Sequence, residues 1–297
     1  MPRPAATPRI HALLLVRDEG DIIEQCLDHL LTWAEGVYVL DTGSTDATWD
    51  IVRSRAAREP SRVFASQTDA AFQCGLRSIL FRRHRRHFRP GDWIARVDAD
   101  EFYHSDPREF LRESVAPHEG RVAALQYLFV LTRPEADAWH DGRETLADRA
   151  RPIEDRRRHY MLEGFPELRF FRYRPTMRWF PERPDPANPG PVAARRIPIR
   201  HYRFRDPPQI RARMQLRQRV AAATPLVGRH WANERIHHAV FNADDPRLHH
   251  WQPGTPLPDH AGQWPEPDAH LGVDPTGRLG RFCHARGLAW ILDLLAR

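Results

Sequence analysis

Short apolar runs alternate with amphipathic stretches along the first third of the chain. Residues 10–16 form an apolar run, and apolar side chains then recur at helical spacing through residues 22–31. The same order returns with a short run at residues 37–40 and a helical pattern around residues 49–52. Strands that alternate with helices in this way run parallel and are joined by right-handed crossovers. The pattern therefore predicts an α/β fold with a mostly parallel sheet flanked by helices.

The alternation continues to a fourth predicted strand. Residues 62–66 predict a short third strand, and residues 70–88 predict a helix that becomes strongly basic toward its end. The fourth strand is predicted at residues 93–97, where the run is largely apolar, as in a strand that is buried on both faces of a sheet. At the start of the first helix, Asp21 is expected to act as the N-cap.

Beyond residue 120 the pattern is less regular. Residues 121–131 predict a long core strand, whereas residues 139–160 are polar and rich in arginine, which is typical of a mobile loop over a site or of a solvated insertion. Residues 167–180 are predicted to form a β-hairpin with its turn at residues 174–176. Prolines exclude regular pairing from residues 181–191.

The last third combines one clear strand and helix with irregular sequence. Residues 197–205 predict a strand, and Asp206 is placed to cap a basic helix that follows it. Residues 223–275 are rich in Pro, Gly, His and Trp and show little periodicity. Residues 282–295 predict a final amphipathic helix.

Acidic side chains follow two of the predicted strands at their carboxyl ends. Asp41 follows the second strand, and Asp98 and Asp100 follow the fourth. In an open α/β sheet these ends meet in one crevice, where Asp41 would hydrogen-bond a base or a ribose. Asp98 and Asp100 flank one small residue, and their oxygens suit Mg²⁺ or Mn²⁺ holding a diphosphate. The alternative is that these acids cap a helix that starts near Pro107.

Composition narrows the classes of protein. The net charge is +6, and all 45 Lys+Arg residues are Arg, which suits phosphate-bearing partners because its planar fork binds two oxygens, although a GC-rich genome gives the same bias. The 3 cysteines are widely spaced, which argues against a disulfide framework or a zinc site and fits a reducing compartment. Because no apolar run approaches the roughly 18 residues of a membrane span, we expect a soluble, cytoplasmic protein.

Three stretches resemble, in order and spacing, the signatures of glycosyltransferase family 2, the inverting GT-A nucleotide-sugar transferases. They are LLVRDEGDII at residues 14–23, LDTGSTDAT at residues 40–48 and RVDADEF at residues 96–102. The resemblance covers residues 8 to 130 and is thin beyond them. It implies a GT-A fold, in which a Rossmann-like sheet flanked by helices carries a less regular C-terminal extension.

The resemblance also implies roles for individual residues. Arg17 and Glu19 would line the nucleotide pocket, and Asp41 would contact the base or the ribose. Asp98 and Asp100 would form the DxD motif, which binds the metal and the nucleotide sugar.

Further positions match the family or depart from it. Arg77 sits where the family often places a basic residue, between the third strand and the DxD motif. His201 resembles the C-terminal histidine of many GT-A enzymes and would be the third metal ligand, the alternative being a core histidine. Asp18 stands where Asn is frequent, which could shift donor preference, and Ala47 replaces a common Gly.

The implied activity is a metal-dependent, hexosyltransferase-like transfer of a sugar, with inversion, from a nucleotide diphosphate sugar to a glycan, lipid-linked or other hydroxyl acceptor. Mn²⁺ or Mg²⁺ would neutralise the departing diphosphate. A carboxylate would deprotonate the acceptor, and Glu163 and Glu182 are the candidate bases, with buried salt bridges as the alternative role for both. Peripheral contact with the inner face of a membrane is compatible with this activity.

The same resemblance divides the chain. A catalytic domain is expected at residues 1–205, with its nucleotide-binding half at about 8–130 and its acceptor half at about 131–205. A helical and irregular extension would occupy residues 206–297.

Two other functions compete with glycosyl transfer. A basic nucleic-acid-binding protein would explain the Arg-His run at residues 82–87, but it would not need acids at two strand ends, so no nucleic acid is expected. A nucleotidyltransferase on a similar fold usually has a glycine-rich phosphate loop after the first strand, whereas residues 17–20 contain one glycine.

Overall fold

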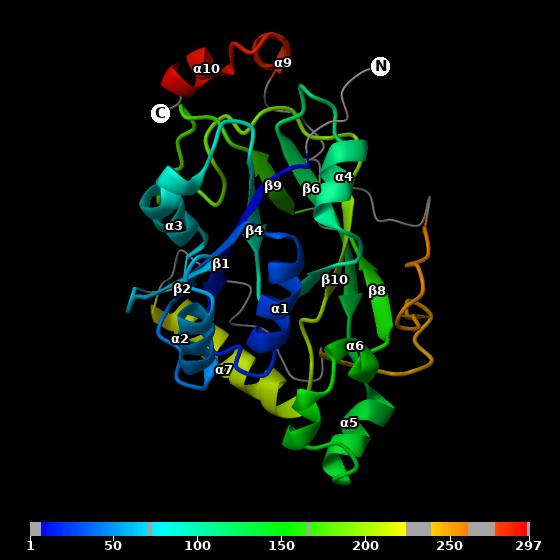
Figure 1. Ribbon diagram of the computed structural model, residues 1–297. Coiled ribbons are helices and arrows are strands. Elements are labelled where there is room, and N and C mark those ends of the chain that lie inside the picture. The colour runs from blue at the N-terminus through cyan, green and yellow to red at the C-terminus, as the bar shows by residue number, and fades with distance from the viewer. Residues whose placement is uncertain (1–6, 71–72, 165–166, 224–238, 261–276, 296–297) are drawn as a thin grey trace.

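A computed structural model of the chain describes residues 7–70, 73–164, 167–223, 239–260 and 277–295. Its first half is the predicted parallel unit, in the strand order β3-β2-β1-β4. The strands are β1 (Ile10–Val16), β2 (Gly36–Asp41), β3 (Val63–Gln67) and β4 (Trp93–Val97). The intervening helices are α1 (Ile23–Trp33), α2 (Thr48–Arg58) and α3 (Arg77–His84), and they flank the sheet (Figure 1). The predicted α/β fold is confirmed.

The second half of the sheet is mostly antiparallel. Strand β9 (Leu168–Arg172) lies between β4 and β6 (Arg121–Phe129) and runs antiparallel to both. On the far side of β6 follow β8 (His159–Glu163) and β12 (His249–His250). Strand β10 (Ile197–His201) pairs parallel with β6 and antiparallel with β5 (Glu101–Tyr103). Among the described residues the sheet has ten strands, of mixed direction.

Burial explains why the central strands are apolar throughout. In β1, Leu14 and Val16 belong to a hydrophobic cluster on one face of the sheet, while Leu13 and Leu15 belong to a second cluster on the other. All four side chains are at most 3% exposed. The sheet is therefore covered on both faces at β1, and its carboxyl end is held in a fixed position.

One prediction for the middle of the chain is wrong, and a second holds only in part. Residues 167–180 do not form a hairpin, because β9 pairs with β4 and β6, and residue Arg178 makes only an isolated bridge to Ala187. Residues 139–160 are not an irregular loop, although residues 140–143, 145–147 and 150–152 are exposed, as in the alternative of a solvated insertion. They contain the end of α5 (Arg133–His140), a 3₁₀ turn (Leu146–Ala150), α6 (Ile153–Arg156) and the start of β8.

Some helix boundaries also differ from those predicted. Asp21 does not cap α1, whose N-cap is Ile22, because the Asp21 carboxylate binds Arg205 instead. The stretch expected as one helix at residues 70–88 contains α3 between two 3₁₀ turns, Cys74–Leu76 and Arg85–His87. The final helix is divided into α9 (Gly277–Ala285) and α10 (Ala289–Leu295), since the chain turns at Gly287, where φ is +72°.

The remaining elements are α4 (Pro107–Glu113), β7 (Leu131–Thr132), α7 (Pro207–Ala223) and β11 (Val240–Phe241). As predicted, the proline-rich stretch at residues 181–191 contains no named helix or strand. Residues beyond 205 contribute β12 to the sheet and α7 beneath its carboxyl end (Figure 1). In the described residues, no helix is both long and apolar enough to cross a membrane. The irregular segment predicted at residues 223–275 lies partly outside the described residues.

Candidate active site

A cleft of about 630 Å³ opens at the carboxyl ends of β1 and β4, as the strand order requires. Its lining combines residues of the N-terminal half with residues of α7, which contributes Arg213, Leu216 and Val220. Seven residues predicted from the sequence line this cleft: Arg17, Glu19, Arg77, Asp98, Asp100, Glu163 and His201. Asp41 and Glu182 are not among the lining residues.

The two DxD acids occupy the turn between β4 and β5. The backbone N–H of Glu101 donates to the carbonyl of Asp98 at 3.3 Å, so the motif forms a tight turn between two strands. The alternative role as a helix cap is wrong, since α4 is capped by Asp106, whose carboxylate accepts from the backbone N–H of Arg108 at 2.8 Å. The DxD acids are thereby left to face the cleft.

Asp98 is the more accessible of the two acids. Its side chain is 35% exposed, and it contacts the buried guanidinium groups of Arg77 and Arg169, the latter at 3.3 Å. Burial alone would raise the pKa of Asp98, but these two cations outweigh it and lower the pKa to about 2. Asp98 is therefore a fully ionised carboxylate that reaches the cleft.

Asp100 is buried beneath three cations. Its Oδ2 atom lies 3.2 Å from Arg213, 3.5 Å from Nε2 of His201 and 3.9 Å from Arg205. Burial would raise its pKa, but His201 and the two arginines hold the pKa of Asp100 well below its usual range. Only 3% of the residue is exposed.

His201 is held between acids. Its Nδ1 atom lies 2.9 Å from Oε1 of Gln126 and 3.8 Å from Glu163. Burial would lower the pKa of His201, but Asp100 and Glu163 outweigh it and raise the pKa to about 9. The two carboxylates therefore favour the protonated imidazole, and a metal would have to displace that proton to bind the ring, so the predicted role of His201 as the third metal ligand stays a prediction.

Glu163 and Glu182, the two candidate bases, lie in different environments. Glu163 is at the end of β8, and both of its oxygens accept from Arg203, each at 2.9 Å. Burial would raise its pKa, but hydrogen bonds from His201 and the charge of Arg203 lower it to about 2. Glu182 is exposed in the proline-rich stretch. Of the two, Glu163 is the residue that the cleft reaches.

Asp41 lies at the end of β2, where it is fully buried. Its Oδ1 atom accepts from the backbone N–H groups of Gly43 and Ser44, at 2.9 and 3.0 Å, and from Gln67 at 3.2 Å. Its Oδ2 atom is buried and has no hydrogen-bond partner. A carboxylate oxygen is costly to bury unless it accepts a hydrogen bond, so this atom is a position where a donor would be stabilised.

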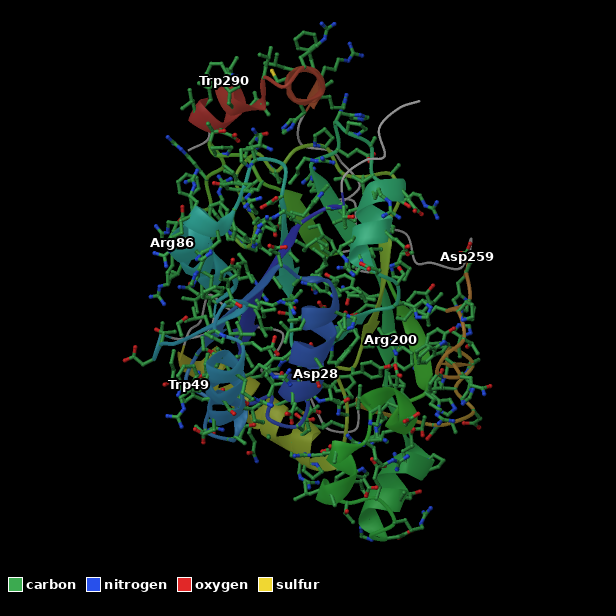
Figure 2. All side chains as sticks on the ribbon, in the orientation of Figure 1. Asp28, Trp49, Arg86, Arg200, Asp259 and Trp290 are labelled. Atoms are coloured by element: carbon green, nitrogen blue, oxygen red, sulfur yellow. The ribbon has the colours of Figure 1, made fainter. Side chains whose placement is uncertain are left out.

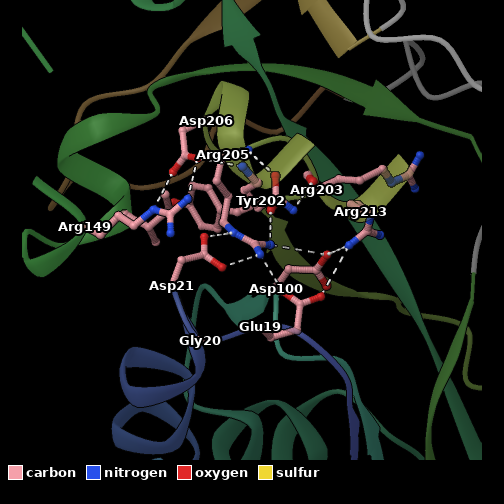
Figure 3. Close-up of polar contacts among 12 residues, drawn as sticks. Glu19, Gly20, Asp21, Asp100, Arg149, Tyr202, Arg203, Arg205, Asp206 and Arg213 are labelled. Carbon is pink, nitrogen blue, oxygen red and sulfur yellow. Dashed lines mark hydrogen bonds and ion pairs between the residues drawn. The ribbon is translucent and has the colours of Figure 1, made fainter. Parts of the chain in front are cut away.

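One arginine joins the first motif to the C-terminal half (Figure 3). Arg205 is fully buried, and its guanidinium donates to both oxygens of Asp21, at 2.6 and 2.8 Å, and to Glu19. Burial raises the pKa of Glu19 to about 7, although Arg205 opposes the shift. No local pattern in the sequence indicates this contact, because Arg205 and Asp21 are 184 residues apart. The only feature of the sequence that marks Arg205 is its position directly before Asp206, the predicted helix cap.

Other functional positions were also missed in the sequence. Arg169 is 1% exposed and contacts Asp98, Glu101 and Glu167, while Arg96 binds Glu167 at 2.8 Å and Asp185 at 2.7 Å. Arg169 belongs to the stretch at residues 167–180, for which the sequence predicted only a hairpin. In the structure Phe170 and Phe171 are core residues, and Arg169 serves the cleft.

The carboxylates of the cleft are possible ligands for a divalent cation. In the part of the chain that the structure describes, no group of three or more His, Cys, Asp and Glu side chains is arranged to hold one. The two DxD carboxylates are ionised, and Asp98 reaches the cleft. Because Mg²⁺ is usually held by one or two carboxylates together with substrate phosphates, the two carboxylates that line this cleft fit that cation.

No family model matches the chain. A TPR repeat-containing protein of Synechococcus elongatus is 31% identical over 97 residues, which is 33% of this chain and 22% of that protein. The chain therefore spans about a fifth of the length of this curated relative.

Solved structures were found at low similarity. The mannosyltransferase PcManGT of Pyrobaculum calidifontis, in complex with GDP-Man and Mn²⁺, matches 58% of this chain and 46% of its own, at 20% identity and a TM-score of 0.33. Glucosyl-3-phosphoglycerate synthase of Mycobacterium tuberculosis matches 56% and 57%, at 18% identity and a TM-score of 0.28. A putative glucose-1-phosphate thymidylyltransferase of Bacillus anthracis matches 43% and 57%, at 15% identity and a TM-score of 0.30.

Proposed function

We propose that the cleft transfers a sugar from a nucleotide diphosphate sugar to an acceptor hydroxyl, with inversion and with the help of Mn²⁺ or Mg²⁺. The observation that carries the proposal is the position of Asp98, an ionised and partly exposed carboxylate at the carboxyl end of β4. The same cleft is lined by Arg17 and Glu19, from the first of the three motifs that resemble glycosyltransferase family 2.

The DxD acids are the residues that would hold the cation. Asp98 offers oxygens to the cleft directly, and Asp100 lies behind it. A divalent ion bound there acts as a Lewis acid and neutralises the negative charge that develops on the departing diphosphate.

The arginines around the acids would stabilise the diphosphate in this proposal. Arg77 and Arg169 are buried and cannot leave, so they keep a fixed positive charge beside the place where the diphosphate would lie. A preorganised charge of this kind stabilises developing negative charge without reorganisation. His201 adds to the same positive field while it is protonated, and it would release that proton on binding the cation as the third ligand.

The Oδ2 atom of Asp41 is proposed to accept a hydrogen bond from the nucleoside. It is buried and unpaired at the end of β2, next to the strand that supplies the first motif. Since Asp41 does not line the cleft, the nucleoside would reach it only as the loop at residues 43–46 adjusts.

Glu163 is proposed as the general base. For this role Arg203 has to move off its two oxygens, which an acceptor hydroxyl would then approach. We expect Glu163→Gln to lower kcat by about 100-fold or more, the usual contribution of a general base, while nucleotide binding persists. Glu182→Gln is the matched control and should keep full activity. The proposal for the base fails if both variants behave alike in steady-state kinetics.

The function is tested with ligands first. UDP, GDP, CDP and dTDP should each be screened by thermal shift with and without Mn²⁺, and we expect one of them to raise the Tm only when the metal is present. With the matching nucleotide sugars, glycosyl transfer releases the nucleoside diphosphate. Nucleotidyl transfer releases pyrophosphate instead. Release of pyrophosphate, or a nucleotide-induced rise in Tm that is the same with and without Mn²⁺, would exclude the proposed reaction.

A further inference from the structure

The two C-terminal helices expose an unusual number of large apolar side chains. We call α9, α10 and the turn between them the C-terminal hairpin, residues 277–295. Seven of its large apolar side chains are exposed: Leu279 69%, Phe282 53%, Leu288 36%, Trp290 48%, Ile291 37%, Leu294 58% and Leu295 72%. Elsewhere in the described residues, Leu146 is the one large apolar side chain with comparable exposure, 61%. Single exposed apolar residues are ordinary, but a contiguous group marks an interaction site.

The hairpin is attached to the rest of the protein through polar contacts. The Asp293 side chain is fully buried and accepts from Arg174 at 2.8 and 3.0 Å and from Asn188 at 3.0 Å. On α9, Nε2 of His284 lies 3.1 Å from Oδ1 of Asn188. An amphipathic helix normally packs its apolar face on the core and turns its polar face to water. Here Asp293 and the small side chains of Cys283 and Ala289 are buried, and the large apolar side chains are the exposed ones.

The exposed charges of the hairpin are all positive. Its charged residues are Arg278, Arg281, Arg286 and Asp293, and the last is buried against Arg174. The Arg286 guanidinium lies 5.5 Å from the ring centroid of Phe282, so one cation borders the apolar surface directly. A short amphipathic helix with large apolar side chains and arginines is the kind that lies in the interface of an anionic membrane.

We propose that the C-terminal hairpin docks on the surface of a membrane that contains anionic lipids. The leucines and Phe282 would enter the boundary between headgroups and acyl chains, and the arginines would contact lipid phosphates. Trp290 projects from α10 away from the body of the protein (Figure 2), and a tryptophan ring is favoured at that depth. A second copy is the less suitable occupant, because stacking two hairpins would bring their arginines together.

Docking in this way leaves the cleft free. The hairpin lies at the end of the molecule opposite α7, which lines the cleft (Figure 1). A protein held by the hairpin would therefore present the cleft to the solution and not to the lipid. The proposal rests on the hairpin alone and does not depend on the reaction assigned to the cleft.

Vesicle sedimentation tests the proposal with the full chain. We expect the protein to sediment with vesicles of phosphatidylcholine mixed with phosphatidylglycerol, and not with phosphatidylcholine alone. The binding should weaken as salt is added, since the contribution of the arginines is screened. Sedimentation with neither vesicle, or equally with both, would overturn the proposal.

Variants at exposed positions locate the surface without disturbing the fold. Leu294→Gln combined with Leu295→Gln should weaken binding to the mixed vesicles by at least about tenfold, because two side chains no longer enter the lipid. The matched control is Leu146→Gln, whose side chain is equally exposed on another element. To test the charge, Arg278→Gln should weaken binding to the mixed vesicles. Its control is Arg53→Gln on α2, whose side chain is 69% exposed and which should bind like the wild type. The proposal also fails if analytical ultracentrifugation shows a dimer that the leucine variants dissociate.

Discussion

Replacing Asp98 with Asn should abolish most of the activity and leave the protein folded. The substitution removes one negative charge and keeps the volume of the side chain, so the cation loses its accessible carboxylate. Losing one preorganised electrostatic contact at a reacting centre lowers kcat by about 100- to 1,000-fold, and we expect at least this loss, together with loss of metal-dependent nucleotide binding.

The fold should survive because the partners of Asp98 have other acceptors. Arg77 also donates to the carbonyl of Val97 at 2.9 Å, and Arg169 keeps Glu101 and Glu167. The Asp98 side chain is 35% exposed, so solvent already screens part of its pairing. The Tm should therefore fall by only a few degrees.

Asp185→Asn is the matched control for Asp98→Asn. It removes a carboxylate that binds Arg96 at 2.7 Å at the edge of the same group of charges, but Asp185 does not line the cleft. We expect this variant to retain activity and nucleotide binding. Normal metal-dependent nucleotide binding by a folded Asp98→Asn protein would show that the cation, if the protein uses one, is held elsewhere.

The parallel half of the fold could be predicted from the sequence because each of its strands and helices has a recognisable local pattern of apolar residues. The run at residues 10–16 became β1 without a shift of boundary, and the run at 93–97 became β4. Both strands are buried on two faces, so their sequences are largely apolar, with His11 in β1 and Arg96 in β4 as buried polar residues. Asp98 and Asp100 at the end of β4 line one cleft with Glu19, which follows β1, whereas Asp41 at the end of β2 does not line the crevice in which it was expected.

The antiparallel half could not be predicted in the same way. Strand β9 pairs with β4 and β6, strands that begin many residues before it, and no local feature of residues 168–172 specifies those partners. The neighbouring stretch at 177–180 looked like the other arm of a hairpin because it also alternates. Packing in the folded sheet favours pairing of β9 with β4 and β6 over pairing with residues 177–180.

The polar stretch at residues 139–160 was misjudged for a related reason. Its arginines suggested solvent, yet Arg156 and Arg157 are at most 5% exposed. They are buried with Glu144, and Arg156 also reaches Asp206, so charges that look solvated in the sequence are paired in the interior. Composition alone does not separate a solvated charge from a paired one, because pairing depends on residues distant in sequence.

Replacing Arg205 with Met should produce the largest loss of stability. Three carboxylates, Glu19, Asp21 and Asp100, surround the buried guanidinium, and Met would leave them without their shared cation. Removing one partner of a buried ion pair usually costs about 3–5 kcal/mol, since the remaining charge stays buried. We expect a fall in Tm of roughly 10 °C, measured by calorimetry in the absence of ligand.

Two companion variants separate charge from geometry. Arg205→Lys keeps the charge but loses the fork that binds both Asp21 oxygens, so its Tm should lie between those of the wild type and Arg205→Met. Arg211→Met changes an exposed arginine on α7 and should leave the Tm nearly unchanged.

A double-mutant cycle then tests whether Asp21 is the main partner of Arg205. In an Asp21→Asn background the charge that Arg205 neutralises is already reduced, so Arg205→Met should cost less there than in the wild type. Additive losses would mean that the two residues stabilise the fold independently, in spite of their contact. Coupling between them would show that this ion pair holds the first motif to the strand and helix that enclose the cleft, because Asp21 precedes α1 and Arg205 follows β10.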